Sequence, residues 1–308
     1  MAITPKSEPK KTMKSVVERM PSIKKACCNI PQTTEDSKPK ARAVFLARRA
    51  SGWQTLHMAK ELADWLRGAG RILVFTGAGI STPSGIPAFR GKGGIWTTRQ
   101  PVYYQDFMAR EGSRIEYWEY KLELWEEHGD AQPNIIHESI VRLEQAGKVE
   151  LVVTQNVDGL HRAAGTREEM LVEVHGTGTL AECQTCGQRN PVEASFKSFK
   201  QNHQPPLCEC GGFLKPATIS FGQNLREADL QSAFAAAVAC DLVIALGSTL
   251  SVSPANAIPL AAAQDGAPYL IINRDETDHD GLPQVALRLT GNVEDLFPPA
   301  VDAALSGD

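Results

Sequence analysis

The chain has 308 residues, which is enough for one large α/β domain or for two smaller domains. Its composition, 42% hydrophobic and 22% charged, is typical of a globular protein, and no apolar run approaches the roughly 18 residues of a membrane helix. The formal charge of −4 conceals an asymmetry, because residues 1–50 carry 12 Lys or Arg against 4 Asp or Glu.

Residues 1–53 form a basic segment that we expect to be a disordered tail. The segment lacks the apolar core of a signal peptide, and its acidic residues, among them Glu8 and Glu18, argue against a transit peptide. Because aromatic residues do not alternate with the basic ones, nucleic acid is not an expected partner of this segment, although an acidic partner stays open. We therefore expect a cytoplasmic protein with no membrane partner.

The first strong pattern is a helix over Thr55–Gly68 followed by a buried strand over Ile72–Phe75. This strand ends in Gly77-Ala78-Gly79, where the backbone can turn sharply and approach a phosphate. The loop does not match a dehydrogenase fingerprint, because Thr82 stands where the third glycine is required. By itself the pattern fits either a phosphate-binding loop or a simple connector.

Two further helices are predicted, over Arg114–His128 and from Pro133 to Ala146, and the first of them belongs to an inserted lid. A second buried strand, Val149–Thr154, delivers polar side chains at its carboxyl end, where ligands bind in open α/β sheets. Without other evidence, this segment could equally be a polar turn. It consists of Gln155, Asn156, Val157 and Asp158.

A short predicted strand, Leu171–Val174, ends at His175-Gly176. Histidine titrates near neutral pH, so a histidine at a strand end is suited to act as a general base. Cys183-x-x-Cys186 and Cys208-x-Cys210 follow with nearby glycines, a spacing that favours one tetrahedral zinc site over two disulfides. A shell of four thiolates is complete, so this zinc is predicted to be structural.

The alternation of strands and helices then continues to the end of the chain. Strands are predicted over Ala217–Phe221, Asp241–Leu246, Tyr269–Asn273 and Val285–Leu289, and helices over Glu227–Ala239 and from Ser253-Pro254 onward. Because several of these strands end in small or polar residues, the sequence predicts a ligand crevice along the carboxyl edge of one parallel sheet.

Together these segments resemble the sirtuin family over about residues 54–305. The shared motifs occur in the family's order: GAGIS (77–81), SGIPAFR (84–90), TQNVDGLH (154–161), HG (175–176), the two cysteine pairs, ISFG (219–222), GSTLSVSP (247–254) and IIN (271–273). The resemblance implies a Rossmann-like open parallel sheet, covering about 54–95, 133–178 and 217–308. It also implies a helical lid at about 96–132 and a zinc-ribbon module at about 179–216.

The resemblance further implies an NAD-dependent protein-lysine deacetylase, an acyltransferase that consumes NAD. In such an enzyme a ribose hydroxyl, freed by His175 as base, attacks an intermediate formed from the acyl-lysine, and the products are lysine, nicotinamide and O-acyl-ADP-ribose. Asn156 and Asp158 are expected to be catalytic residues together with His175, and a monomer is expected. The implied NAD contacts are Gly77, Ala78, Gly79, Ile80, Phe89, Arg90, Gln155, Asn156, Val157, Asp158, Gly247, Ser248 and Asn273.

Family members that prefer succinyl groups carry a Tyr-x-x-Arg pair in the helical lid. No arginine follows Tyr117 or Tyr120 at that spacing, so we expect neutral acyl groups, with acetyl first. Ala88 and Gln223 stand where many members carry acidic residues. A mono-ADP-ribosyltransferase and a non-catalytic NAD sensor are the alternatives on the same fold, and an oxidoreductase is disfavoured by the fingerprint mismatch.

Overall fold

The structure is a computed structural model, and it describes residues 52–90, 94–95 and 99–306. The predicted tail, residues 1–53, therefore lies almost entirely outside the described residues. No helix within the described ranges is long and apolar enough to cross a bilayer.

The main sheet contains six parallel strands in the spatial order β3-β2-β1-β7-β8-β9. Every residue of β1, β7 and β8 is buried, as expected for central strands that are covered on both faces. The order runs outward from β1 to β3 and then from β7 to β9, so the switch point lies between β1 and β7. The strands are β1 (Ile72–Thr76), β2 (Val149–Thr154), β3 (Leu171–Glu173), β7 (Leu242–Leu246), β8 (Tyr269–Asn273) and β9 (Val285–Thr290).

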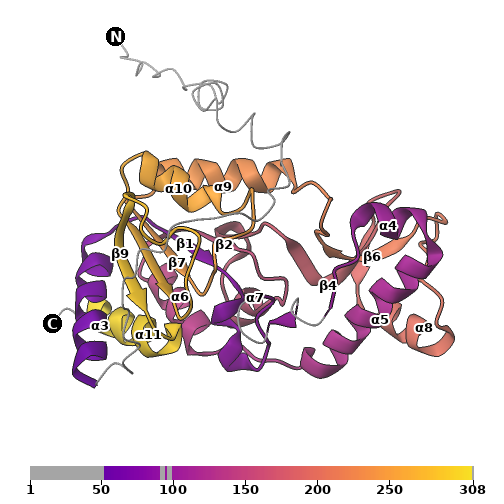
Figure 1. The fold of residues 1–308 in the computed structure, drawn as a ribbon, viewed down its shortest axis with the longest axis horizontal. Coiled ribbons are helices and arrows are strands. Elements are labelled where there is room, and N and C mark those ends of the chain that lie inside the picture. Colours follow the sequence, from indigo (N-terminus) through magenta and orange to yellow (C-terminus); the bar gives the residue numbers. More distant parts are fainter. Residues whose placement is uncertain (1–51, 91–93, 96–98, 307–308) are drawn as a thin grey trace, which may run out of the picture. The chain divides into compact units, whose positions relative to one another are not determined.

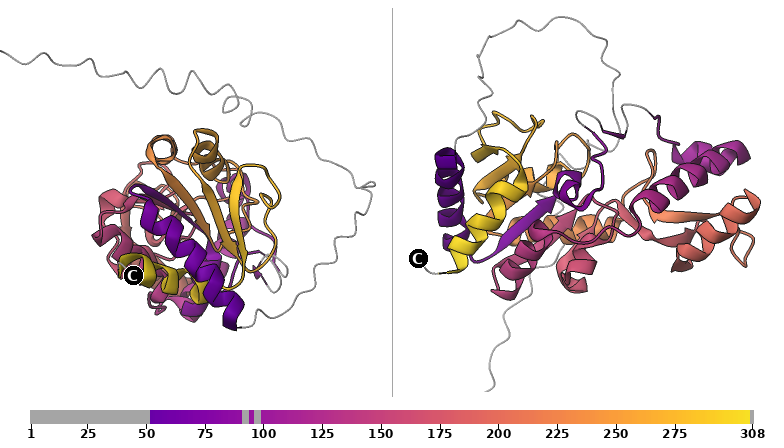
Figure 2. Two further views of the ribbon diagram at one scale, coloured as in Figure 1. Left: turned by 90° about the vertical axis from the view of Figure 1, so that its left-hand side faces the viewer. Right: turned by 90° about the horizontal axis from the view of Figure 1, so that it is seen from below.

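Helices cover both faces of this sheet (Figure 1). The helices α3 (Gly52–Gly68), α6 (Ile135–Gln145) and α11 (Val293–Leu305) share one hydrophobic core with the sheet, and Figure 2 shows α3, in indigo, beside α11, in yellow. The helices α9 (Glu227–Ala239) and α10 (Ala257–Gln264) lie on the opposite face. Shorter elements are α7 (Leu160–Ala164), η1 (Ala78–Ile80), η2 (Thr82–Ser84) and η4 (Glu168–Met170).

A second, antiparallel sheet has the order β5-β4-β6 and carries the cysteines. Its strands are β4 (Gly176–Cys183), β5 (Arg189–Pro191) and β6 (Leu214–Thr218). The predicted helical insertion packs here, because Trp118 is fully buried with its ring 5.5 Å from that of Phe196. The helices of this region are α4 (Tyr104–Ala109), α5 (Glu111–His128) and α8 (Glu193–Asn202).

Most predicted elements are confirmed, and β2, β8 and α9 have the predicted bounds. The prediction of a strand over Ala217–Phe221 in the main sheet is wrong. The strand is β6, it begins at Leu214, and it pairs with β4 in the small sheet. A continuous apolar run gives no information about which sheet a strand joins, because that choice depends on contacts distant in sequence.

The predicted helix start at Ser253-Pro254 is also wrong, because α10 begins at Ala257. The preceding residues form turns instead. The side chain of Asn256 donates to the carbonyl of Leu250 (3.0 Å), and its backbone N–H donates to the carbonyl of Val252 (2.9 Å). The side-chain bond belongs to these turns, whereas the bond from residue 256 to residue 252 has the spacing of a helical turn.

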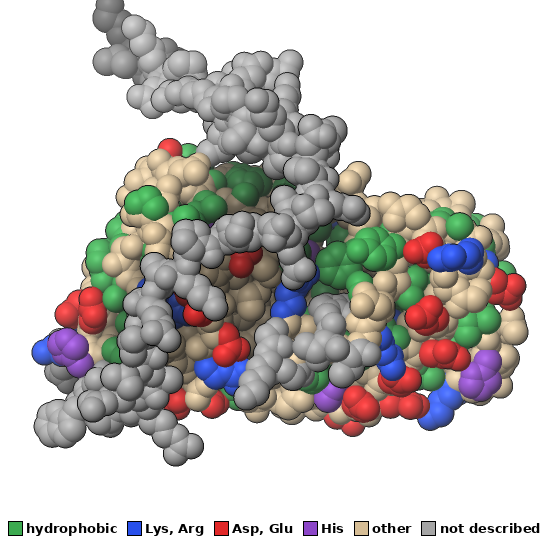
Figure 3. Space-filling view, viewed as in Figure 1, with side chains coloured by type: hydrophobic (Ala, Val, Ile, Leu, Met, Phe, Trp, Pro, Cys, Tyr) green, Lys and Arg blue, Asp and Glu red, His purple; other side chains and the backbone are tan. Residues whose placement is uncertain are grey.

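Figure 3 shows acidic and basic side chains intermixed on one face of the molecule. Oppositely charged side chains also form ion pairs among the described residues, such as Arg142 with Asp302 and Lys200 with Glu126. Within the part of the chain that the structure describes, this face therefore presents no extended patch of a single charge sign.

Candidate active site

Five neighbouring strands of the main sheet deliver the predicted site residues to one edge. The loop 77–81 follows β1, residues 155–158 follow β2, and His175 follows β3. On the other side of the switch point, Gly247-Ser248 follows β7 and Asn273 ends β8. The parallel order of the strands thus brings together residues that lie almost 200 positions apart in the sequence.

The two glycines of the first loop are required by the packing of the loop itself. A Cβ atom on Gly77 would lie 2.8 Å from the Gly247 carbonyl oxygen, and one on Gly79 would lie 2.7 Å from the Gly247 Cα. The backbone N–H of Gly79 donates to the Gly247 carbonyl (2.8 Å). Glycine therefore lets the loops after β1 and β7 meet at the switch point, where Ile80 is buried beneath them.

Ser81 joins the two polar side chains that follow β2. Its hydroxyl donates to Oδ2 of Asp158 (2.8 Å) and accepts from Nδ2 of Asn156 (3.1 Å). Nδ2 of Asn156 also donates to the carbonyl of Gly77 (3.2 Å), and the N–H of Leu160 donates to Oδ1 of Asp158 (2.9 Å). Burial raises the pKa of Asp158, while the two donors to its carboxylate oppose that shift.

His175 is held in one orientation by a backbone carbonyl. Its Nδ1 lies 3.1 Å from the carbonyl oxygen of Gln155, and since a carbonyl only accepts, Nδ1 carries the hydrogen. Nε2 of the neutral ring is then the proton acceptor. Burial lowers the pKa of His175, and the charge of Arg90 lowers it further, while the bond to Gln155 raises it. The ring therefore stays neutral to a lower pH than a free histidine.

On the other side of the switch point, the site edge carries Ser248 and Asn273, which are both buried. The hydroxyl of Ser248 accepts from Nε2 of Gln155 (2.7 Å), so the loops after β2 and β7 are joined. Nδ2 of Asn273 donates to the carbonyl of Asp275 (2.9 Å). Val157, the remaining residue of the β2 loop, is half-buried, and its carbonyl accepts from the N–H of Gly178 (2.7 Å).

Two predicted contact residues, Phe89 and Arg90, end the described part of the loop that follows η2. The guanidinium carbon of Arg90 lies 6.0 Å from the centroid of the Phe221 ring. Phe221 belongs to the turn after β6, so the loop that carries Arg90 and this turn lie next to each other.

Ser81 and Asn134 have no assigned role in the sequence analysis, yet both organise the site. Asn134 caps α6 by accepting from the N–H of Ile136 (2.9 Å). Its Nδ2 also donates to the carbonyl of Ile80 and to the hydroxyl of Ser84, at 2.8 Å each. An Asn before a helix signals a cap, but the sequence does not reveal that the same side chain anchors the first loop.

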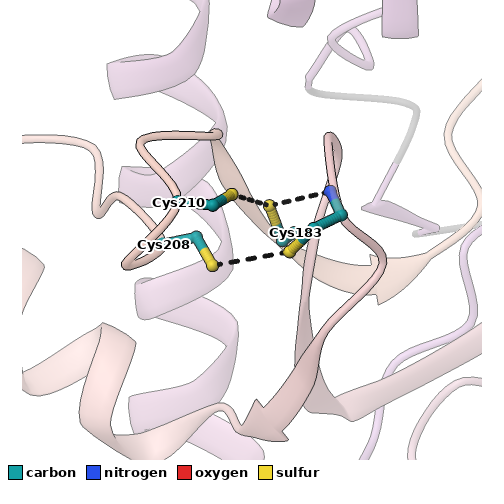
Figure 4. Close-up of side chains that lie close together, drawn as sticks. Cys183, Cys208 and Cys210 are labelled. Atoms are coloured by element: carbon teal, nitrogen blue, oxygen red, sulfur yellow. Dashed lines mark hydrogen bonds between the residues drawn. The ribbon is translucent and has the colours of Figure 1, made fainter.

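The four predicted zinc ligands lie together, with all their sulfur atoms within 4.8 Å of one another. Sγ of Cys183 is 3.6 Å from that of Cys210, and Sγ of Cys186 is 3.8 Å from that of Cys208 (Figure 4). A disulfide requires about 2.05 Å, whereas sulfurs on one tetrahedral zinc lie about 3.8 Å apart. The donor set therefore fits one zinc ion, and a full thiolate shell gives that ion a structural role.

Comparisons with known proteins agree with this geometry. Residues 77–254 match the model of the Sir2 family. The NAD-dependent protein deacetylase 1 of Bradyrhizobium diazoefficiens is 42% identical over 229 residues, covering 74% of this chain and 90% of that protein. The NAD-dependent protein deacetylase of Rhodopseudomonas palustris is 39% identical over 230 residues, covering 74% of this chain and 91% of that protein.

Solved Sir2 structures share the fold. One Sir2 enzyme superimposes with a TM-score of 0.72 and 32% identity, covering 82% of this chain and 99% of that chain. A Sir2 complex with a p53 peptide and NAD+ superimposes with a TM-score of 0.67 and 31% identity, covering 80% of this chain and 95% of that chain.

Proposed function

We propose that this chain, which belongs to the Sir2 family of sirtuins, is an NAD-dependent protein deacetylase. The observation that carries this proposal is the convergence of the strand ends around His175, whose Nδ1–H is fixed on the Gln155 carbonyl. A neutral imidazole with Nε2 free to accept a proton is what a general base requires.

NAD is a substrate in this proposal: it supplies the departing nicotinamide and the ribose that receives the acyl group. The loop 77–80 holds the pyrophosphate at the switch point between β1 and β7. Arg90 would lie near the pyrophosphate and Phe89 would shield the reacting ribose, while Ser248 and Asn273 would hold the adenosine half.

The chain's side chains divide the chemical work near the scissile bond. His175 accepts a ribose hydroxyl proton at Nε2, because its pKa keeps that nitrogen unprotonated near neutral pH. Gln155 and Asn156 hold the ribose hydroxyls, and Val157 and Asp158 form the pocket for the nicotinamide carboxamide. Ser81 holds Asn156 and Asp158 in one arrangement through its two hydrogen bonds.

The protein substrate is an acyl-lysine peptide, as supported by the related Sir2 complex with a p53 peptide and NAD+. We place this peptide as an added strand along Phe221-Gly222 and Ser251-Val252. The N–H of Tyr104 donates to the Phe221 carbonyl (2.9 Å) and holds the first of these segments in place. A monomeric state and a cytoplasmic location complete the proposal, and sedimentation and fractionation would test them.

Incubation with NAD and an acetyl-lysine peptide, analysed by mass spectrometry, tests the function. We expect nicotinamide, free lysine and O-acetyl-ADP-ribose in equal amounts. His175→Ala should abolish their formation, whereas His57→Ala, at an exposed position of α3, should not alter it. More than a few per cent of activity in a folded His175→Ala variant would overturn the assigned base. ADP-ribose recovered on protein would instead favour a mono-ADP-ribosyltransferase, and binding of NAD without turnover would favour a sensor.

A further inference from the structure

A pocket of about 120 Å³ lies beside the small sheet, outside the site described above. Its walls come from β4, β6 and the turn that follows β6. Polar and charged side chains dominate the lining: Glu182, Gln184, Lys215, Gln223, Asn224 and Arg226. A polar pocket with several converging donors is a candidate for binding a specific polar group.

Lys215 is the unusual member of this lining, because it is only 1% exposed. Its Nζ donates to the backbone carbonyls of Pro216 and Thr218 and lies 5.6 Å from the centroid of the Tyr117 ring. Within the part of the chain that the structure describes, no carboxylate forms an ion pair with Lys215. The side chain of Tyr117 is a further hydrogen-bond partner of Lys215, so the described residues satisfy the ammonium, and what Lys215 offers a ligand is its positive charge. Buried charges are usually paired, and an anionic ligand would supply that pairing.

Glu182 is the one carboxylate among the described residues that line the pocket, and two guanidinium groups bind it. Its Oε2 accepts from Nε of Arg189 (2.6 Å) and from Nη2 of Arg226 (2.9 Å). The other N–H groups of Arg226 have no acceptor among the described side chains. Oε1 of Gln223 accepts from the N–H of Ser220 (3.1 Å), which leaves its amide hydrogens as donors. The unused hydrogen-bonding capacity of Arg226 and Gln223 is therefore that of donors, and Lys215 adds a positive charge, which together suit an anionic, acceptor-rich ligand.

The position of the pocket indicates where such a ligand comes from. Gln223 and Asn224 directly follow Phe221-Gly222, the segment proposed to pair with the substrate peptide. A turn places them there, since the N–H of Gln223 donates to the Ser220 carbonyl (3.0 Å) and Gly222 has the left-handed φ of 81°. A peptide strand that pairs with Phe221-Gly222 would therefore place some of its side chains next to this pocket.

We propose that this pocket binds the carboxylate of an aspartate or glutamate that lies close to the acyl-lysine in the substrate chain. The proposal rests on the proposed deacetylase function and adds a sequence preference to it. Lys215 and Arg226 attract the carboxylate, and the amide of Gln223 donates to it.

Matched peptides test the preference. The acetyl-lysine peptides are made in pairs that differ at one position near the acetyl-lysine. One member of each pair carries Asp or Glu at that position, and the other carries the neutral isostere, Asn or Gln. At one or more positions we expect kcat/KM for the acidic peptide to exceed that for its neutral partner about tenfold, the effect of one or two charge-assisted hydrogen bonds. Lys215→Met, which preserves the length of the side chain without its charge, should reduce this ratio to about one. Arg226→Gln should reduce it as well and serves if Lys215→Met does not fold.

Lys200→Met is the matched control, because Lys200 is exposed and pairs with Glu126 away from the pocket. It should leave the ratio unchanged. A ratio near one at every position in the unmodified protein, or a ratio that persists in both pocket variants, would overturn the proposal. A preference for succinyl-lysine that disappears in Lys215→Met would also overturn it, because the bound carboxylate would then belong to the acyl group.

Failure of the proposed function itself would look different. In that case neither the acidic nor the neutral peptide would be deacetylated. Fluorescence anisotropy of the same labelled peptides still measures their binding, so the ratio of dissociation constants for the Asp and Asn peptides decides on the pocket independently of turnover.

Discussion

Two buried histidines, His137 on α6 and His161 on α7, should make the stability of the fold depend on pH. The exposed fractions of their side chains are 0% and 2%, and their ring centroids lie 5.1 Å apart. Nδ1 of His137 accepts from the N–H of Asn134 (3.4 Å), and Nε2 of His161 lies 3.0 Å from the hydroxyl of Thr76. The second ring nitrogen of each has no partner among the described residues.

Burial disfavours the charged form of both rings. It lowers the pKa of His137 to about 4, and together with the neighbouring His137 it lowers the pKa of His161 to about 3. In the unfolded chain both histidines have a pKa of about 6.5. Because the unfolded state binds more protons between these values, the stability present above pH 6.5 is lost progressively as the pH falls toward 4.

The magnitude follows from proton linkage. Between about pH 7.5 and pH 5.0, each histidine with a folded pKa near or below 4 lowers the free energy of unfolding by about 2 kcal/mol, or about 4 kcal/mol for the pair. This is a large part of the roughly 5–15 kcal/mol that stabilises a typical domain.

Urea unfolding of the purified protein at both pH values measures this loss. His137→Asn preserves an acceptor near the position of Nδ1 but does not titrate, so its loss between the two pH values should be smaller by about 2 kcal/mol. Carboxylates titrate alike in both proteins and cancel in the difference. His57→Asn, at an exposed position on α3, should show the same loss as the unmodified protein. If His137→Asn lost as much stability as the unmodified protein, the burial argument for this pair would be wrong.

Four further predictions concern the site and the small sheet. Because the pKa of His175 is lowered, the acid limb of kcat/KM should lie below pH 6.5, and a limb at or above that value would contradict the assigned environment. Acetyl-lysine peptides should be processed faster than succinyl-lysine peptides in steady-state assays, and the reverse order would refute the expected neutral acyl preference. Cys208→Ser should remove the single zinc, measured by elemental analysis, and lower the unfolding midpoint by about 5 °C or more. Asn134→Asp keeps the helix cap but replaces the group that donates to the Ile80 carbonyl by an acceptor. The KM for NAD should therefore rise about tenfold with little change in the unfolding midpoint, and an unchanged KM would exclude a positioning role for Asn134.

Features of this protein whose signals are local could be predicted from the sequence. The apolar runs before residues 77, 155 and 247 identify buried strands, because only a strand covered on both faces is apolar throughout. The cysteine spacing identifies a zinc site, since tetrahedral thiolate ligands need short knuckles. These features, together with the motif order, were sufficient to predict the fold class, the cofactors and most of the edge on which the site lies.

The way in which distant loops support one another could not be predicted from the sequence and follows from the folded arrangement. Gly77 and Gly79 must be glycines because the loop carrying Gly247 packs against them, and Ser81 matters because it joins Asn156 to Asp158. The same is true of Lys215, whose burial depends on the pairing of β6 with β4 rather than with the main sheet. The physical reason is that strand order and register bring these groups together, and a pattern of apolar and polar residues along one strand specifies neither.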